Sequence, residues 1–197
     1  MSLVDDKRQR MTPDEFLAWQ LRQDRLYEFV DGLPLLPLKM MAGATQRHDR
    51  VVINAILSLG NQLRGKPCRP MTSDVAVSIP KGNFRRPDIT VECGKPESDR
   101  TMTAQEPRVV MEVLSPSTLS FDRFRKLEEY KTTPGLKVVL LVDTELPQVT
   151  VHRRDGDRWQ VNTLEGLDSV IGLAEIGATL ALRDLYDGVV FGEAGPA

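Results

Sequence analysis

Apolar residues recur at helical spacing from Thr45 to Leu63. They form a single stripe, which predicts an amphipathic helix packed on the core. Residues 12–15, TPDE, form a capping box with proline at the first helical position, so a shorter helix is expected over residues 13–20.

Other stretches alternate with the period of two that is typical of strands. RLYEFVDGLPLLPL alternates around Asp31-Gly32 and predicts a hairpin of two short strands. CRPMTSDVAVSI and PDITVEC, joined by PKGNFRR, are expected to be neighbouring antiparallel strands. QVTVHRR and RWQVNTLEG predict an outer hairpin around Asp155-Gly156, and ATLALRDLYD predicts a short terminal helix.

The middle of the chain has the order strand, helix, strand. EPRVVMEVLS predicts the first strand, STLSFDRFRKLEEYK the helix, and LKVVLLVD a strand so apolar that both its faces should be covered. A parallel strand pair with a right-handed helical crossover follows. Because the sequence contains no repeat or linker, we expect one mixed α/β domain over residues 12–190, with a central mixed sheet flanked by helices and tails at 1–11 and 191–197.

Composition changes this picture little. The 197 residues are 41% hydrophobic and 27% charged, as in ordinary globular proteins and unlike disordered or membrane proteins. A net charge of -2 argues against a surface that binds nucleic acid over its whole extent, although a local basic patch is allowed. The N-terminus has no apolar signal core, so we expect a reducing cytoplasmic location with Cys68 and Cys93 as core thiols and no disulfide.

A single carboxylate interrupts the apolar run in VVMEVL. Burying Glu112 without a partner would cost several kcal/mol, so something must compensate it. If its strand lies beside PDITVEC, Asp88 can approach Glu112, and two such carboxylates need a proton or a divalent cation between them; their oxygens suit Mg²⁺ or Mn²⁺. Two plainer interpretations remain open: Glu112 pairs with Arg85 or Arg86, or Asp88 belongs to a Pro-Asp turn.

The helix after this strand carries a polar stripe. Asp122, Lys126 and Tyr130 are spaced i, i+4 and i+8, so they share one face. A lysine there could extend over the end of the Glu112 strand and stabilise charge on a phosphate, or it could be an ordinary solvated residue.

Together these motifs resemble one known family. RRPDITV, VVMEVLSPST, FDRFRKLEEYK and VVLLVD, preceded by YEFVDGLPL and TQRHDRV, are similar to the Uma2 family of restriction-endonuclease-like proteins, within the PD-(D/E)xK nuclease superfamily. The resemblance covers roughly residues 12 to 187. Leu114 departs from the superfamily pattern, because it stands where lysine is usual; Lys126 on the next helix resembles the migrated replacement.

The resemblance implies a site and a reaction. Asp88, Glu112 and Lys126 would be catalytic, and Mg²⁺ or Mn²⁺ would be held by Asp88, Glu112, the carbonyl of Val113 and, directly or through water, Glu28. Asp122 and Tyr130 would support Lys126, and His48 matches a recurrent helix histidine that could also be a simple hydrogen-bonding residue. The expected activity is endonucleolytic cleavage of nucleic acid, preferably DNA, by a homodimer.

Two alternatives stay open at this point. The same fold could serve as an inactive nucleic-acid-binding or protein-interaction module. The same metal chemistry could also hydrolyse another kind of phosphoester.

Overall fold

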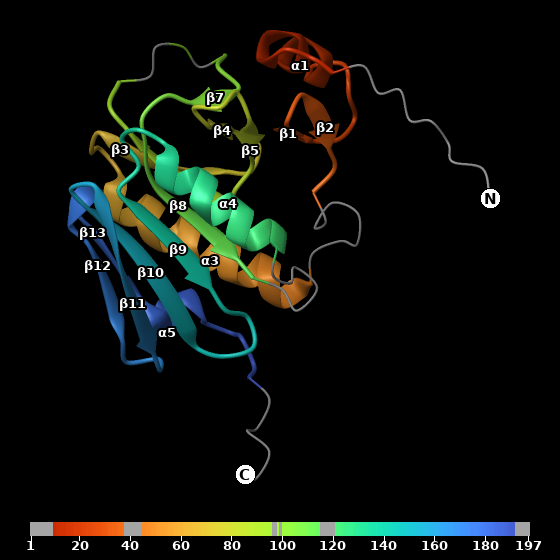
Figure 1. Cartoon of the computed structure of the whole chain (residues 1–197). Coiled ribbons are helices and arrows are strands. Elements are labelled where there is room, and N and C mark those ends of the chain that lie inside the picture. The colour runs from red at the N-terminus through yellow and green to blue at the C-terminus, as the bar shows by residue number, and fades with distance from the viewer. Residues whose placement is uncertain (1–9, 38–44, 96–97, 99, 115–120, 192–197) are drawn as a thin grey trace.

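A central mixed sheet organises the molecule. The computed structural model describes residues 10–37, 45–95, 98, 100–114 and 121–191. For residues 121–123 it describes the backbone only. The sheet has the strand order β11-β10-β9-β8-β6-β3, and Figure 1 shows helices on both of its sides. Its strands are β3 (Cys68–Thr72), β6 (Ile89–Cys93), β8 (Pro107–Val113), β9 (Val138–Val142), β10 (Gln148–Asp155) and β11 (Arg158–Glu165). The predicted mixed α/β fold is therefore observed.

Two long helices cover opposite faces of this sheet. Helix α3 (Gln46–Leu63) packs Val51, Ala55 and Leu59 against one face. Helix α4 (Phe121–Thr132) packs Leu127 and Tyr130 against the other. Alternate residues of β8 serve the two cores, with Val109, Met111 and Val113 on the α3 side and Val110 on the α4 side. Glu112 therefore belongs to the α4 side.

Strands β8 and β9 run parallel, and α4 is the crossover between them. Their register pairs Glu112 with Leu141 and Val113 with Val142. All five residues of β9 are buried, as its continuous apolar run predicts for a strand covered on both faces. This unit confirms the predicted strand-helix-strand arrangement.

A second, smaller sheet has the order β2-β1-β5-β4-β7 and contacts the middle of α4 through the ion pairs of Glu28 with Lys126 and of Arg85 with Glu129. Its strands are β1 (Glu28–Val30), β2 (Leu33–Leu35), β4 (Ala76–Ser78), β5 (Phe84–Arg85) and β7 (Thr103–Ala104). The hairpin β1-β2 has the predicted turn, in which Asp31 and Gly32 both adopt positive φ. Helix α1 (Pro13–Gln20) begins with the predicted capping box of Thr12 and Glu15, and Phe16 stacks on Phe29 of this sheet.

One strand prediction requires correction. The segment CRPMTSDVAVSI is not a single strand, because it turns at Thr72, whose carbonyl accepts a bond from the Val75 N–H. Its first part, β3, pairs antiparallel with β6 as expected, but its second part, β4, crosses into the small sheet. The connecting segment also contains an unexpected strand, β5, which bridges β4 and β1.

The C-terminal region contains one hairpin more than the pattern predicts. The expected hairpin β10-β11 is present. It is followed by a separate antiparallel pair, β12 (Val170–Leu173) and β13 (Ala178–Ala181), with a 3-10 turn, η1 (Ala174–Ile176), between them. The expected short helix is α5 (Leu182–Leu185). Within the described ranges, no helix has the length and apolar character to cross a bilayer.

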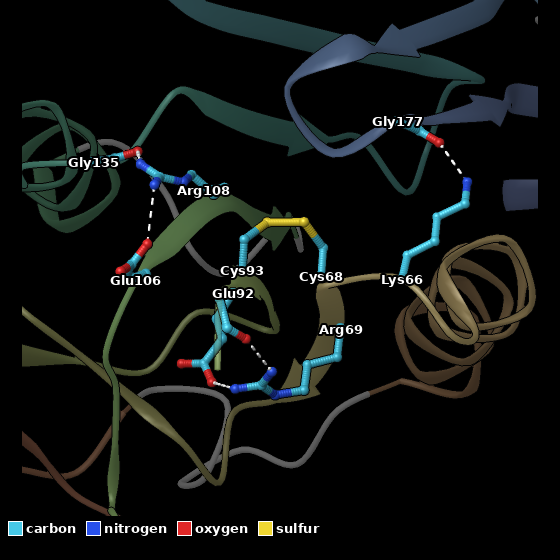
Figure 2. Close-up of a disulfide and its surroundings, with 10 residues drawn as sticks. Lys66, Cys68, Arg69, Glu92, Cys93, Glu106, Arg108, Gly135 and Gly177 are labelled. Carbon is cyan, nitrogen blue, oxygen red and sulfur yellow. Dashed lines mark hydrogen bonds and ion pairs between the residues drawn. A yellow bond between two sulfur atoms is a disulfide. The ribbon is translucent and has the colours of Figure 1, made fainter. Parts of the chain in front are cut away.

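The two cysteines form a disulfide, which corrects the expectation of two core thiols. Cys68 and Cys93 occupy directly opposed positions of β3 and β6, and their Cα atoms are 3.9 Å apart. Figure 2 shows the bridge beside the ion pair of Arg69 with Glu92, which joins the same two strands one position further along. The expectation of free thiols rested on the inferred reducing location, and the pattern of the strands did not predict the register that places the two cysteines opposite each other.

Candidate functional site

Asp88 directly precedes β6 and is held at both carboxylate oxygens. Oδ2 accepts a hydrogen bond of 2.8 Å from the main-chain N–H of Val113, at the end of β8. Oδ1 lies 3.3 Å from Nε2 of His48, in the first turn of α3. The residue is 5% exposed. Elements β6, β8 and α3 therefore meet at this carboxylate.

Glu112 lies on β8 next to that point. Because β6 and β8 are antiparallel with Ile89 opposite Met111, the preceding Asp88 falls beside Glu112 in the register. The condition under which the sequence lets Asp88 approach Glu112, that their strands are neighbours, is therefore met. Glu112 is half-buried, and its Oε1 accepts a bond of 2.7 Å from the hydroxyl of Tyr130 on α4.

Tyr130 is fully buried between α4 and the sheet. Burial raises the pKa of its hydroxyl well above the ordinary value, and the neighbouring negative charge of Glu112 raises it further. Tyr130 therefore stays protonated and donates its hydrogen to Glu112. Asp122, predicted to lie on the same stripe, falls in the first turn of α4, where side chains lie outside the described part of the structure.

Lys126 lies one turn before Tyr130 on α4 and points toward β1. Its Nζ is 2.9 Å from Oε1 of Glu28, and the lysine side chain is 13% exposed. Glu28 itself is 1% exposed, in the middle of the interface between the small sheet and α4. The predicted lysine and the predicted N-terminal acid therefore form an ion pair with each other.

Glu28 also binds a fully buried arginine. Its Oε2 is 2.8 Å from Nη1 of Arg85, and its Oε1 accepts a longer bond of 3.3 Å from the Arg86 main-chain N–H. Burial alone would raise the pKa of Glu28, but Lys126 and then Arg85 outweigh it and lower that pKa. Glu28 is thus ionised inside the protein.

Arg85 bridges two carboxylates from different elements. Besides Glu28 on β1, its Nε lies 2.5 Å from Oε2 of Glu129 on α4. Burial would lower the pKa of Arg85, yet Glu129 and Glu28 raise it. We call these four residues, Glu28, Arg85, Lys126 and Glu129, the Arg85 network.

The sequence did not reveal the Arg85 network. The sequence allowed Arg85 as a partner of Glu112, but its partners in the structure include Glu28 and Glu129. No periodicity marks Arg85 as buried, because its strand, β5 (Phe84–Arg85), has only two residues. Arg86 is buried too, and its guanidinium donates to the carbonyls of Tyr27, Ser73 and Asp74.

The donor set suits a hard divalent cation only in part. Asp88 and Glu112 supply oxygens from adjacent strands, and Mg²⁺ is often held by one or two carboxylates, with water and substrate phosphates completing its shell. Within the described ranges, however, no group of three or more His, Cys, Asp or Glu side chains is arranged to hold a metal ion. Asp88 and Glu112 are therefore the candidate ligands at this point of the sheet.

The chain is similar to a known protein family, to two proteins of known sequence and to one solved structure. The family model of Uma2, described as "Putative restriction endonuclease", matches residues 13–183. Two uncharacterized proteins of Synechocystis sp. are similar: one is 29% identical over 92% of this chain and 94% of its own length, the other 28% over 82% and 91%. The crystal structure of a "putative nuclease belonging to DUF820" from Anabaena variabilis shares the fold, with a TM-score of 0.71 at 18% identity over 91% of this chain and 99% of that one.

Proposed function

Because the chain belongs to the Uma2 family of putative restriction endonucleases, we propose that it is a metal-dependent endonuclease that hydrolyses phosphodiester bonds, with DNA as substrate. The observation that carries the proposal is the register of β6 and β8, which sets Asp88 beside Glu112 on adjacent strands, while Tyr130 of the helix that also carries Lys126 binds Glu112. Carboxylates paired in this way, with a lysine nearby, are the groups that phosphoryl transfer with a metal requires.

Each residue has a role in this proposal. Asp88 and Glu112, with the carbonyl of Val113, would hold Mg²⁺ or Mn²⁺, which when bound would polarise the phosphate and make water a better nucleophile. Lys126 would stabilise negative charge that develops on the phosphate. Tyr130 orients Glu112, and the Val113 N–H and His48 orient Asp88.

Plasmid nicking tests the proposal. We expect the protein to relax supercoiled DNA with Mg²⁺ or Mn²⁺, and Asp88→Asn, Glu112→Gln and Lys126→Gln each to lower the rate at least about 100-fold, as loss of transition-state stabilisation by a few kcal/mol does. Glu106→Gln is the control, because it removes a largely exposed partner of Arg108. Equal nicking by the wild type and all three site variants would reject the assignment.

One observation favours a second candidate, a nucleic-acid-binding module without turnover. It is the absence, among the described side chains, of a cluster of three or more metal-ligating groups. Thermal unfolding separates the two candidates, because a metal that binds only the folded state raises its melting temperature. The nuclease should show a Mn²⁺-dependent rise that Asp88→Asn abolishes, and the binding module should show none.

A further inference from the structure

We infer that Glu28 and Arg85 are positioning residues and that Glu28 is not a metal ligand. Arg85 holds the carboxylate of Glu28 in place, and Glu28 in turn holds the ammonium group of Lys126. The catalytic role of the positioned Lys126 rests on the proposed function. The positioning role of Glu28 departs from the one that the family resemblance implies for it.

The contacts of Glu28 support this assignment. Both of its carboxylate oxygens are engaged, Oε1 by Lys126 Nζ at 2.9 Å and Oε2 by Arg85 Nη1 at 2.8 Å. A metal ion at either oxygen would have to compete with a bonded cation in a place that is 1% exposed. At Asp88, Oδ2 accepts from the main-chain N–H of Val113 and Oδ1 lies 3.3 Å from Nε2 of His48.

Arg85 links the two elements, β1 and α4, whose side chains Glu28 and Lys126 form the ion pair. The guanidinium, 0% exposed, joins β1 through Glu28 to α4 through Glu129. Glu129 also accepts bonds from Asn83 and from Arg125, and Arg125 reaches Asp31 at the tip of the β1-β2 hairpin. Lys126 and Glu129 lie on the same helix, so Arg85 sets the place of that helix relative to the carboxylate that its lysine binds.

The Arg85 network requires its four side chains to be ionised. Isolated charges at this depth would be strongly unfavourable, and pairing them compensates the lost hydration. An uncharged amide at position 28 keeps the shape of the side chain but holds an ammonium far less well than a carboxylate does. The lysine would then lose its fixed place while the fold persists.

Nitrogen-15 NMR of lysine ammonium groups tests the inference without reference to activity. A buried, ion-paired ammonium exchanges its protons slowly, so the wild type should show a protected Nζ signal that Lys126→Gln identifies by its loss. We expect Glu28→Gln to lose that signal too, and Glu106→Gln to retain it. Retention of the Lys126 signal in Glu28→Gln would overturn the positioning role.

Mn²⁺ binding, measured by electron paramagnetic resonance, tests the second half of the inference. Asp88→Asn should weaken binding at least 10-fold, whereas Glu28→Gln should change it less than twofold. If Glu28→Gln weakened Mn²⁺ binding as much as Asp88→Asn, Glu28 would be a ligand and the inference would be wrong. If the wild type bound no Mn²⁺ and nicked no DNA, the proposed function would fail, and the ammonium signal would still decide whether Glu28 positions Lys126.

A double variant separates positioning from folding. Glu28→Gln leaves Arg85 with one carboxylate fewer, so its melting temperature should fall; Glu28→Gln with Arg85→Met removes both charges and should regain at least half of that loss. We expect nicking by the double variant to stay as low as in Glu28→Gln, at least 10-fold below the wild type. Recovery of nicking together with stability would mean that the two residues serve folding alone.

Discussion

At the residue scale, buried charge is the feature that distinguishes this protein from an ordinary mixed α/β domain. Arg85, Glu28 and Asp88 all lie inside the protein, where an unpaired charge would be strongly unfavourable. Each has charged or hydrogen-bonding partners from a different element. The stability of the site region should therefore depend on ionisation states as well as on apolar packing.

The lowered pKa of Glu28 predicts a pH-dependent stability. Near its ordinary pKa of 4.5 the unfolded chain takes up the proton before the folded protein does. The stabilisation is thus complete above about pH 4.5 and is lost as the pH falls through the lower folded value. Glu28→Gln should cost about 3 kcal/mol at pH 7, because it breaks a buried pair, and less below pH 4. Urea unfolding between pH 3 and 7 measures the difference, and a gap that stays constant with pH would contradict the assignment.

Tyr130→Phe tests the support given to Glu112. Loss of the 2.7 Å bond leaves a half-buried carboxylate oxygen with one donor fewer. We expect a loss of about 1–2 kcal/mol in the free energy of unfolding and a lower nicking rate. Tyr27→Phe is the matched control, since it removes a hydroxyl from a tyrosine that packs on Trp19, away from Glu112. Equal effects of both substitutions would argue against a particular role for Tyr130.

At the scale of elements, the parts that the sequence predicted are those governed by local rules. The capping box of α1, the Asp31-Gly32 turn and the apolar run of β9 each determine their element within a few residues. Strand β5 was missed, because two residues give no periodicity, and its pairing with β1 and β4 depends on distant segments. The candidate site divides in the same way. The pattern predicted the two strands that carry Asp88 and Glu112, but their pairing and the contacts of Arg85 depend on the tertiary fold.

The capping box permits a direct test of local control. The Thr12 hydroxyl accepts from the Glu15 N–H, and the Glu15 carboxylate accepts from the Thr12 N–H. Thr12→Ala should cost about 1 kcal/mol of stability, because it removes an N-cap acceptor. Thr12→Ser should cost much less, since it keeps the hydroxyl. Chemical unfolding of the two variants compares them, and equal losses would show that the cap does not contribute.

At the scale of the whole molecule, the disulfide is the cross-link between an edge and the interior of the large sheet. It ties edge strand β3 to β6, the strand that follows Asp88, and closes a segment whose ends are 25 residues apart. The register of β3 and β6 is set by pairing along five positions. The disulfide therefore forms because this register places the two cysteines opposite each other, and the register does not depend on the disulfide.

Reduction should therefore weaken the protein without changing its fold. For a loop of this length, chain-entropy arguments give about 3.5 kcal/mol of stabilisation. We expect a reducing agent to lower the melting temperature of the wild type and to leave that of a Cys68→Ser/Cys93→Ser variant unchanged. Thiol titration of the unfolded protein measures the bridge directly, and two free thiols in the absence of a reductant would contradict it.

The Arg85 network also constrains the order in which the chain can fold during its synthesis. Glu28 leaves the ribosome 57 positions ahead of Arg85, and α4 follows later still. Water must solvate the early carboxylate until both cations exist, since an acid cannot be buried alone. The N-terminal hairpin should accordingly dock late, after the middle of the chain has been translated, although it is made first.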